Sequence, residues 1–203
     1  MKVFVTGIDT GIGKTHVCAH YLNQWASQRP AYYKPIQTGS PSREQAEDVL
    51  TVQSLTGRQG DPTISCGLCL KAPLSPYQAS KLDAQILMPE TILADLHRVI
   101  AKHDWLVVEG AGGVLVPITQ TFFMIDLIEA SGLPVIVVTH PRLGTLNHTL
   151  LTLSALQQRH IPIQGFVMNP FPASPSLADA DIITMIETLS GVSCLFVLDE
   201  PSL

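Results

Sequence analysis

The sequence has few charges, no cluster of basic residues and no long apolar run. Charged residues make up 14% of the 203 residues, and the formal net charge is −5. A negative chain without a basic patch has no electrostatic attraction to nucleic acid. No apolar stretch approaches the ~20 residues that span a bilayer, and the N-terminus lacks the basic and apolar segments of a signal peptide. We therefore expect a cytoplasmic protein that binds neither nucleic acid nor a membrane.

Cysteine is also scarce, and the motifs of common hydrolases are missing. The cysteines are Cys18, Cys66, Cys69 and Cys194. Only Cys66 and Cys69 are close, and no second pair completes a zinc site, so ordinary thiols are the simpler interpretation; a redox or metal role of this CxxC stays open. His16 and His20 lie one helical turn apart, but Val17 stands where a zinc protease needs glutamate. No Gly-x-Ser-x-Gly turn occurs either.

The chain does contain a regular alternation of short apolar runs and helix-length segments. Hydrophobic residues make up 46% of the sequence, with no internal repeat or low-complexity linker, so we predict a single domain over residues 1–203. The predicted strands are Val3–Thr6, Ala31–Lys34, Trp105–Glu109, Val135–Thr139, Gly165–Met168 and Cys194–Leu198. The predicted helices are His16–Gln28, Pro89–His103, Met124–Ala130, Leu146–Arg159 and Leu177–Leu189. This order predicts an α/β fold with a mainly parallel sheet covered by helices on both faces. Irregular structure is expected over Arg58–Pro76.

The segment after the first predicted strand has the residues of a phosphate-binding loop. It reads VTGIDTGIGKT from Val5 to Thr15. Glycines let backbone N–H groups converge on phosphate oxygens, Lys14 can reach the β- and γ-phosphates, and Thr15 can offer its hydroxyl to Mg²⁺ at a helix N-terminus. The loop is one residue longer than the strict pattern, since Ile8 takes the place of the first glycine. A dinucleotide site is disfavoured because His16 stands at the third glycine position. We predict a nucleoside triphosphate site.

Two other predicted strands end in charged residues at the same edge of the sheet, where ligands of parallel sheets bind. Glu109 ends a buried strand and precedes the small residues of 110–113. Its carboxylate can bind Mg²⁺, and the small residues let backbone amides approach a substrate or phosphate. Lys34, at the tip of the second strand, can neutralise a developing anion. A solvated glutamate and a solvated lysine are the respective alternatives.

Two segments carry weaker signals. The run LGTLNH from Leu143 to His148 opens a long helix, whose free N–H groups and dipole can receive a carboxylate. Helix capping by Thr145 or Asn147 explains this run equally well. Asp48 lies in a polar, helical stretch, where an exposed helix face is the default interpretation.

In their order along the chain these segments resemble the dethiobiotin synthetase family, which is related to the ParA and nitrogenase iron-protein ATPases. The resemblance covers nearly the whole length. The blocks that carry it are VTGIDTGIGKT (5–15), YKPIQTGS (33–40), Ser75-Pro76, VEGAGGV (108–114) and LGTLNH (143–148). Five ordered blocks are far more specific than a phosphate loop alone.

The resemblance implies an ATP-dependent synthetase of biotin biosynthesis that requires Mg²⁺. Its substrates would be 7,8-diaminononanoate, CO₂ and ATP. A carbamate forms on one amine, and its oxygen attacks the γ-phosphate to give a carbamic-phosphoric anhydride. The second amine then closes the cyclic urea and expels phosphate. The protein mainly has to align anions and neutralise charge.

The resemblance also implies roles for individual residues. Lys14 and Lys34 would be catalytic, with Lys34 stabilising the carbamate and the transferred phosphoryl group. The Mg²⁺ ligands would be Thr15, Asp48 and Glu109. The nucleotide would contact Thr10, Gly11, Ile12, Gly13, Lys14, Thr15, Glu109 and Asn169, with Asn169 reading the base. The substrate would contact Thr10, Thr38, Gly112, Gly144, Thr145 and Asn147. The family is a homodimer, so the last three residues would cap the substrate carboxylate of the other subunit.

The chain departs from the family pattern near the nucleotide. Gly11 occupies a position that is glutamate in some members, and the sequence ends soon after the last predicted strand, where longer members continue. We expect ATP as the donor, with tolerance for other nucleoside triphosphates as a hypothesis.

The alternative is a ParA-like switch ATPase that acts through a protein partner. Such proteins carry a signature lysine early in the loop, where this chain has Asp9. A cobyrinate-type synthetase would need a glutaminase domain that does not fit the remaining length, and a nitrogenase-like reductase would need cluster cysteines after Glu109.

Overall fold

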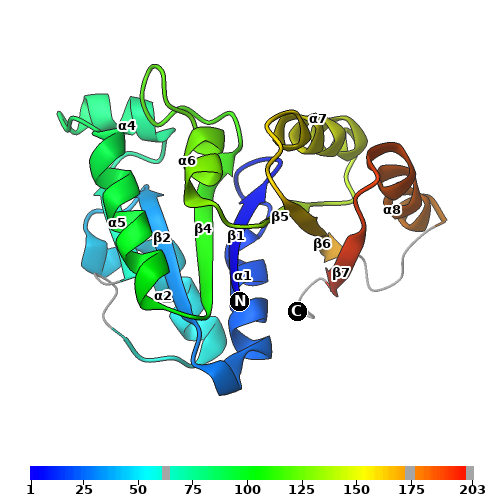
Figure 1. Ribbon diagram of the computed structural model, residues 1–203, viewed down its shortest axis with the longest axis horizontal. Coiled ribbons are helices and arrows are strands. Elements are labelled where there is room, and N and C mark those ends of the chain that lie inside the picture. Colours follow the sequence, from blue (N-terminus) through cyan, green and yellow to red (C-terminus); the bar gives the residue numbers. More distant parts are fainter. Residues whose placement is uncertain (61–64, 172–176, 200–203) are drawn as a thin grey trace.

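The computed structural model describes residues 1–60, 65–171 and 177–199. Within them the chain forms one seven-stranded parallel sheet in the order β3-β2-β4-β1-β5-β6-β7. The strands are β1 Lys2–Gly7, β2 Ala31–Thr38, β3 Cys66–Leu70, β4 Leu106–Gly113, β5 Val135–Thr139, β6 Ile163–Phe171 and β7 Cys194–Asp199. Figure 1 shows β1 near the middle of the sheet, between β4 and β5. The α/β fold with a parallel sheet is thereby confirmed.

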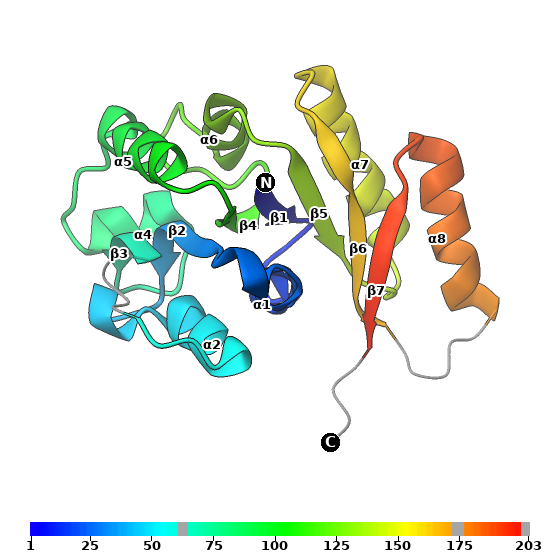
Figure 2. The ribbon, with the colours of Figure 1, turned by 60° about the horizontal axis from the view of Figure 1, so that its bottom comes forward.

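Helices cover both faces of this sheet, as expected for parallel strands joined by crossovers. One face is packed by α1 Lys14–Gln24 and α2 Glu47–Thr56. The other face is packed by α4 Pro76–Leu82, α5 Pro89–Lys102, α6 Met124–Ser131, α7 Thr145–Gln158 and α8 Leu177–Ser190. Figure 2 shows α1 and α2 on the side of the sheet opposite to α5, α6, α7 and α8.

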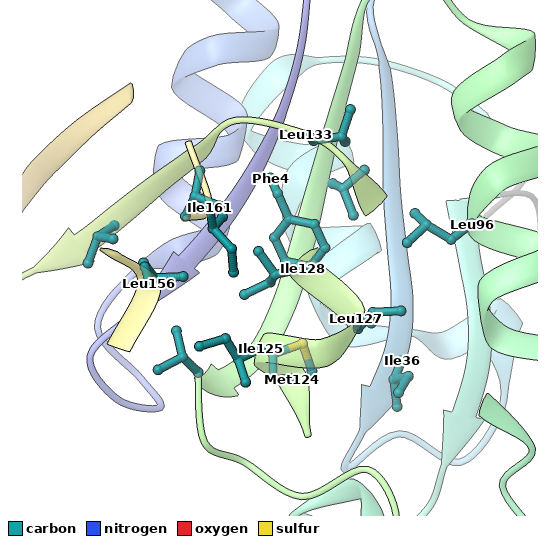
Figure 3. Close-up of a cluster of buried hydrophobic side chains, with 14 of the residues drawn as sticks. Phe4, Ile36, Leu96, Met124, Ile125, Leu127, Ile128, Leu133, Leu156 and Ile161 are labelled. Atoms are coloured by element: carbon teal, nitrogen blue, oxygen red, sulfur yellow. The ribbon is translucent and has the colours of Figure 1, made fainter. Parts of the chain in front are cut away.

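The strands are short apolar runs that suit a sheet buried on both faces. β5 has the sequence VIVVT and is buried throughout, and its β-branched side chains pack well on a pleated surface. Figure 3 shows the larger core cluster, in which Phe4 of β1 lies among side chains of α6 such as Ile128. Full burial of one such side chain contributes about 1.5–3 kcal/mol, so this core holds the strands in register.

The predicted end of the second strand is wrong, and a proline is the physical reason. The second strand does not end at Lys34 but continues to Thr38 as β2. Pro35 has no N–H for a ladder, which favours ending a strand there. In the structure β2 pairs with β4 up to Tyr33 and then with β3 from Lys34, and Pro35 is not among the paired residues. Lys34 therefore lies within the strand and not at its tip.

The expectation of irregular structure over Arg58–Pro76 is wrong in part, because β3 forms within that segment, whereas residues 71–75 have no helix or strand. Residues 61–64 of the segment lie outside the described part of the chain. Glycine is depleted in strands and the run CGLCL has no β-branched or aromatic residue, so it gives little signal, and pairing with β2 decides the outcome. Gly67 is required there, since a Cβ would lie 2.5 Å from the carbonyl oxygen of Pro35.

The other predicted strands and helices are present with shifted ends; β4 continues past Glu109 to Gly113, and helix α4 was not predicted. The first helix begins at Lys14 and ends at Gln24, followed by a separate 3₁₀ turn over Ala26–Gln28. The cysteines are free thiols. Across residues 1–60, 65–171 and 177–199, no three His, Cys, Asp or Glu side chains gather as metal ligands. None of the helices described there is both long and apolar enough to cross a bilayer.

Candidate active site

The phosphate-binding loop joins β1 to α1 at the carboxyl edge of the sheet. Gly11 and Gly13 have φ angles of 71° and 83°, in the left-handed region that favours glycine. A Cβ at Gly13 would lie 1.8 Å from Nδ2 of Asn169, so any other residue there would force the Asn169 side chain to move. The Asn169 amide donates to the carbonyl of Ile12 at 2.9 Å. The predicted base-reading residue therefore packs directly against the loop.

Lys14 begins α1 and is almost completely buried, with 6% of its surface exposed. Its ammonium donates to the carbonyl oxygen of Asp9 at 2.7 Å, across the loop. Burial lowers the pKa of Lys14 to about 8, and the nearby Lys34 adds to this while Glu109 and Asp48 oppose it. A lysine held over the loop in this way is placed to meet an incoming polyphosphate.

Three elements bring the other charged groups together beside this loop. The Lys34 ammonium on β2 donates to Glu109 Oε1 on β4 at 2.9 Å and forms an ion pair with Asp48 on α2. The Thr15 hydroxyl lies 3.1 Å from Glu109 Oε1 and 3.3 Å from Asp48 Oδ1. The exposed fractions of Lys34 and Glu109 are only 3% and 1%. The alternatives of a solvated lysine, a solvated glutamate and an unpaired Asp48 on an exposed face are therefore wrong.

The protonation state of Lys34 follows from competing effects. Burial alone would lower its pKa, but the carboxylates of Glu109 and Asp48 outweigh burial and raise the pKa above the ordinary lysine value. The group is therefore a permanent cation at neutral pH. It can neutralise a developing anion without losing its proton.

The backbone around Asp48 explains how α2 delivers this carboxylate. The helix begins at Glu47, whose N–H donates to Ser40 Oγ at 3.1 Å. The next N–H, of Asp48, donates to Gln37 Oε1 at 3.4 Å. Both acceptors come from β2 or the turn after it, so they satisfy free N–H groups of the first helical turn. They fix the start of α2, and with it Asp48, against the strand that carries Lys34.

A cavity of about 590 Å³ lies at this edge of the sheet. Its lining includes the predicted site residues Thr10, Gly11, Gly13, Lys14, Thr15, Lys34, Thr38, Asp48, Glu109 and Gly112. Pro73, Leu74, Ser75 and Pro76 close one side. A neighbouring cavity of about 450 Å³ shares Gly11 and Gly13 and includes Ile12, His20, Arg142 and Asn169. The two cavities have room for a nucleotide and a small substrate side by side.

The oxygen atoms of Thr15, Asp48 and Glu109 suit Mg²⁺. One hydroxyl and two carboxylates converge, with the hydroxyl within hydrogen-bonding distance of both. Mg²⁺ is a hard cation that binds one or two carboxylates, keeps several waters and takes phosphate oxygens as further ligands. The donor set therefore fits a magnesium–nucleotide complex better than a cation enclosed by protein alone.

The structure does not bring Gly144, Thr145 and Asn147 into either cavity. Gly144 precedes α7, and Asn147 is exposed on its first turn. The Thr145 hydroxyl is buried and lies 2.7 Å from Thr139 Oγ1, so helix anchoring accounts for it. Leu143 beside them is fully exposed. Within one chain these residues lie apart from the other predicted substrate contacts.

Sequence reasoning missed two polar residues on β2. The Tyr32 hydroxyl donates to Glu109 Oε2 at 2.8 Å, and Gln37 holds Asp48 as described. A signal was present for Tyr32, because it stands two residues before Lys34 and side chains at i and i+2 of a strand share a face. Gln37 gave no comparable signal, since its partner lies on a separate helix.

Comparison with known proteins agrees with this geometry. Residues 1–200 match the family described as AAA domain. The ATP-dependent dethiobiotin synthetase of Bacillus subtilis is 34% identical over 196 residues, which is 96% of this chain and 85% of that protein. That of Paramagnetospirillum magneticum is 41% identical over 172 residues, 82% of this chain and 75% of that protein. This chain belongs to the dethiobiotin synthetase family.

Two further comparisons concern a longer relative and a solved structure with a similar fold. The biotin biosynthesis bifunctional protein of Bordetella avium is 37% identical over 203 residues, covering 97% of this chain but only 40% of the larger protein. This member of the dethiobiotin synthetase family thus spans less than half of that bifunctional relative. A ParA family ATPase from Chlorobium tepidum aligns with 98% of this chain and 85% of its own, with a TM-score of 0.57 and 16% identity. At that identity the likeness shows the shared fold alone.

Proposed function

We propose that this protein is an ATP- and Mg²⁺-dependent ligase that converts 7,8-diaminononanoate and CO₂ to dethiobiotin in biotin biosynthesis. One observation carries the proposal. In a member of the dethiobiotin synthetase family, Lys14, Lys34, Thr15, Asp48 and Glu109 line one cavity next to a phosphate-binding loop. Phosphoryl transfer needs such positioning and charge neutralisation more than any covalent help from the protein.

The nucleotide would bind across the two adjoining cavities. The triphosphate would lie over Thr10, Gly11, Ile12 and Gly13 at the start of α1, where the loop N–H groups and the helix dipole favour anions. Lys14 would exchange its bond with the Asp9 carbonyl for the β- and γ-phosphates. Asn169, which is 7% exposed and lines the second cavity, would offer its amide to the base.

Thr15, Asp48 and Glu109 would hold Mg²⁺, which when bound neutralises charge on the transferred phosphoryl group. Glu109 is fixed by hydrogen bonds on both carboxylate oxygens, and Asp48 by the start of α2. In the structure the Lys34 ammonium contacts both Asp48 and Glu109, so it lies where Mg²⁺ would bind these two carboxylates. Lys34 would then turn toward the substrate.

Lys34 would act on the substrate at the centre of the cavity. A diamine nitrogen attacks CO₂ and loses a proton to give a carbamate, and the carbamate oxygen attacks the γ-phosphorus as ADP leaves. The second amine then attacks the carbonyl carbon, phosphate leaves, and the cyclic urea is formed. The ammonium of Lys34 would then stabilise the negative charge of the carbamate and of the transferred phosphoryl group.

The remaining contacts would anchor the diamine. Thr10, Thr38 and the backbone of Gly112 line the same cavity and would bind the amine end. Neither cavity is lined by Gly144, Thr145 or Asn147. This placement suits residues that bind the substrate of a second subunit. We therefore propose a homodimer in which the start of α7 caps the substrate carboxylate of the other protomer, so that remote binding energy orients the reacting end. We further propose that residues 1–203 form a single catalytic domain and that the protein is cytoplasmic.

The test is phosphate release by the purified protein with Mg-ATP and bicarbonate, with and without 7,8-diaminononanoate, while the cyclic urea is followed by mass spectrometry. We expect urea and phosphate to appear together. Phosphate release that is indifferent to the diamine, with no urea formed, would favour a ParA-like switch ATPase with a protein partner.

A further inference from the structure

The two oxygens of the Glu109 carboxylate have different partners. Oε1 faces the cavity side, where it accepts from Lys34 Nζ at 2.9 Å and lies 3.1 Å from the Thr15 hydroxyl. Oε2 accepts a hydrogen bond from the Tyr32 hydroxyl at 2.8 Å. Tyr32 is 9% exposed and packs in the core beneath the site, with Val5 and Val107 in the same cluster. One oxygen of the Glu109 carboxylate is thus held by Tyr32 on the core side, and the other contacts Lys34 and Thr15 on the cavity side.

Without this hydroxyl the orientation of Glu109 would be poorly defined. The terminal torsion of a glutamate has a broad energy profile, so packing of the stem alone does not fix the carboxylate plane. Cys18 also lies against the carboxylate, but a thiol is a weak donor. Tyr32 comes from the neighbouring strand, whose register places it opposite Val107, and it is the stronger of these two donors.

The Tyr32 hydroxyl can only act as a donor in this contact, because a carboxylate oxygen accepts and the phenol carries the proton between them. Groups that bond the ligands of a metal ion in this way set ligand orientation, and their loss typically weakens metal affinity about 10–100-fold.

We propose that Tyr32 is a positioning residue for the magnesium–nucleotide complex: by holding Glu109 Oε2 it turns Oε1 toward Thr15 and the phosphate-binding loop. This inference rests on the proposed Mg²⁺ site, not on the identity of the diamine. Tyr32 touches neither nucleotide nor substrate in this scheme, and it acts only through Glu109.

The test is the affinity of the full-length protein for ATP, measured by calorimetry in EDTA and at a series of Mg²⁺ concentrations. For Tyr32→Phe we expect unchanged affinity in EDTA and an apparent Mg²⁺ constant weakened about 10-fold. The matched control is Tyr33→Phe, which removes a hydroxyl from the next residue, also buried at 3% exposure but in the other core cluster. It should alter neither quantity.

A double variant tests whether Tyr32 acts through the carboxylate. In a Glu109→Gln background, Tyr32→Phe should cause no further loss of Mg²⁺ dependence. During turnover, Tyr32→Phe should raise the Mg²⁺ concentration needed for half-maximal rate while kcat recovers at saturating Mg²⁺, which a merely misfolded fraction would not do. Equal Mg²⁺ constants in wild type and Tyr32→Phe, or an equal loss of affinity in EDTA, would overturn the inference. Because the binding assay contains no diamine, it gives a result even if the protein makes no dethiobiotin.

Discussion

Replacement of Lys34 by methionine tests the charge balance of the site. Methionine keeps an unbranched stem of similar length but removes the ammonium that bonds Glu109 and Asp48. The two carboxylates would then face each other without their cation, in a place where Glu109 is 1% exposed. We expect loss of dethiobiotin formation together with a less stable free protein.

The size of the stability loss follows from burial. Breaking a buried ion pair by removing one partner costs about 3–5 kcal/mol, because the remaining charge stays desolvated. The Asp48 side chain is 28% exposed, and Tyr32 still donates to Glu109, so the lower end of the range applies. For a protein of this length, about 3 kcal/mol corresponds to a drop of roughly 6–12 °C in the unfolding midpoint.

The same reasoning predicts how the variant responds to Mg²⁺. A divalent cation between Asp48 and Glu109 would replace the missing positive charge, so Mg²⁺ should raise the unfolding midpoint of Lys34→Met more than that of wild type. Calorimetric midpoints in EDTA and in Mg²⁺ measure both effects. Lys102→Met is the matched control, since it removes an exposed lysine from the last turn of α5. An unchanged midpoint in EDTA, or equal Mg²⁺ responses of variant and wild type, would refute the argument.

Three other predictions concern the nucleotide. Gly13→Ala should abolish ATP binding in calorimetry, because its Cβ would lie 1.8 Å from the Asn169 amide at a left-handed φ; retained affinity would contradict this close packing of the loop against Asn169. Burial lowers the pKa of Lys14 to about 8, so ATP affinity measured in EDTA should fall as pH rises through about 8. Deprotonation removes the charge that meets the phosphates, and below that pH the charged form prevails. Lys14→Met should lack this pH dependence, and a wild-type affinity that stays constant from pH 7 to 9 would count against the prediction. Turnover with CTP and GTP as well as ATP tests nucleotide tolerance, and strict dependence on ATP would end that hypothesis.

The fold was largely predictable because its signals are local. Strands such as β5 are continuous apolar runs, and glycine followed by lysine and threonine at the start of the first helix predicts a phosphate loop. The errors occur where local chemistry and tertiary pairing disagree. The second strand was predicted to end at Lys34, and β3 was not predicted because its sequence has no β-branched or aromatic residue, yet the two segments pair side by side.

The candidate site was predictable in part for the same reason. Lys14 and Thr15 come after β1, and Glu109 lies in the carboxyl-terminal half of β4. Both strands end at the same edge of the sheet, so topology alone brings these residues together. Asp48 had no such signal, and only its likeness to a family motif selected it. Its position depends on Ser40 and on Gln37, which fix the start of α2 through hydrogen bonds that no spacing rule predicts.

The sequence by itself determined the parallel sheet, the phosphate-binding loop and the edge at which polar residues gather, because hydrophobic period and glycine placement act over a few neighbouring residues. Only the tertiary structure decided that Lys34 is buried between two carboxylates and that Tyr32 holds one of them from below. Lys34 and Glu109 are 75 positions apart along the chain, and Tyr32 and Glu109 are 77 positions apart. The pKa values and the orientation of these groups arise from burial and charge contacts that exist only once β2, β4 and α2 are packed together.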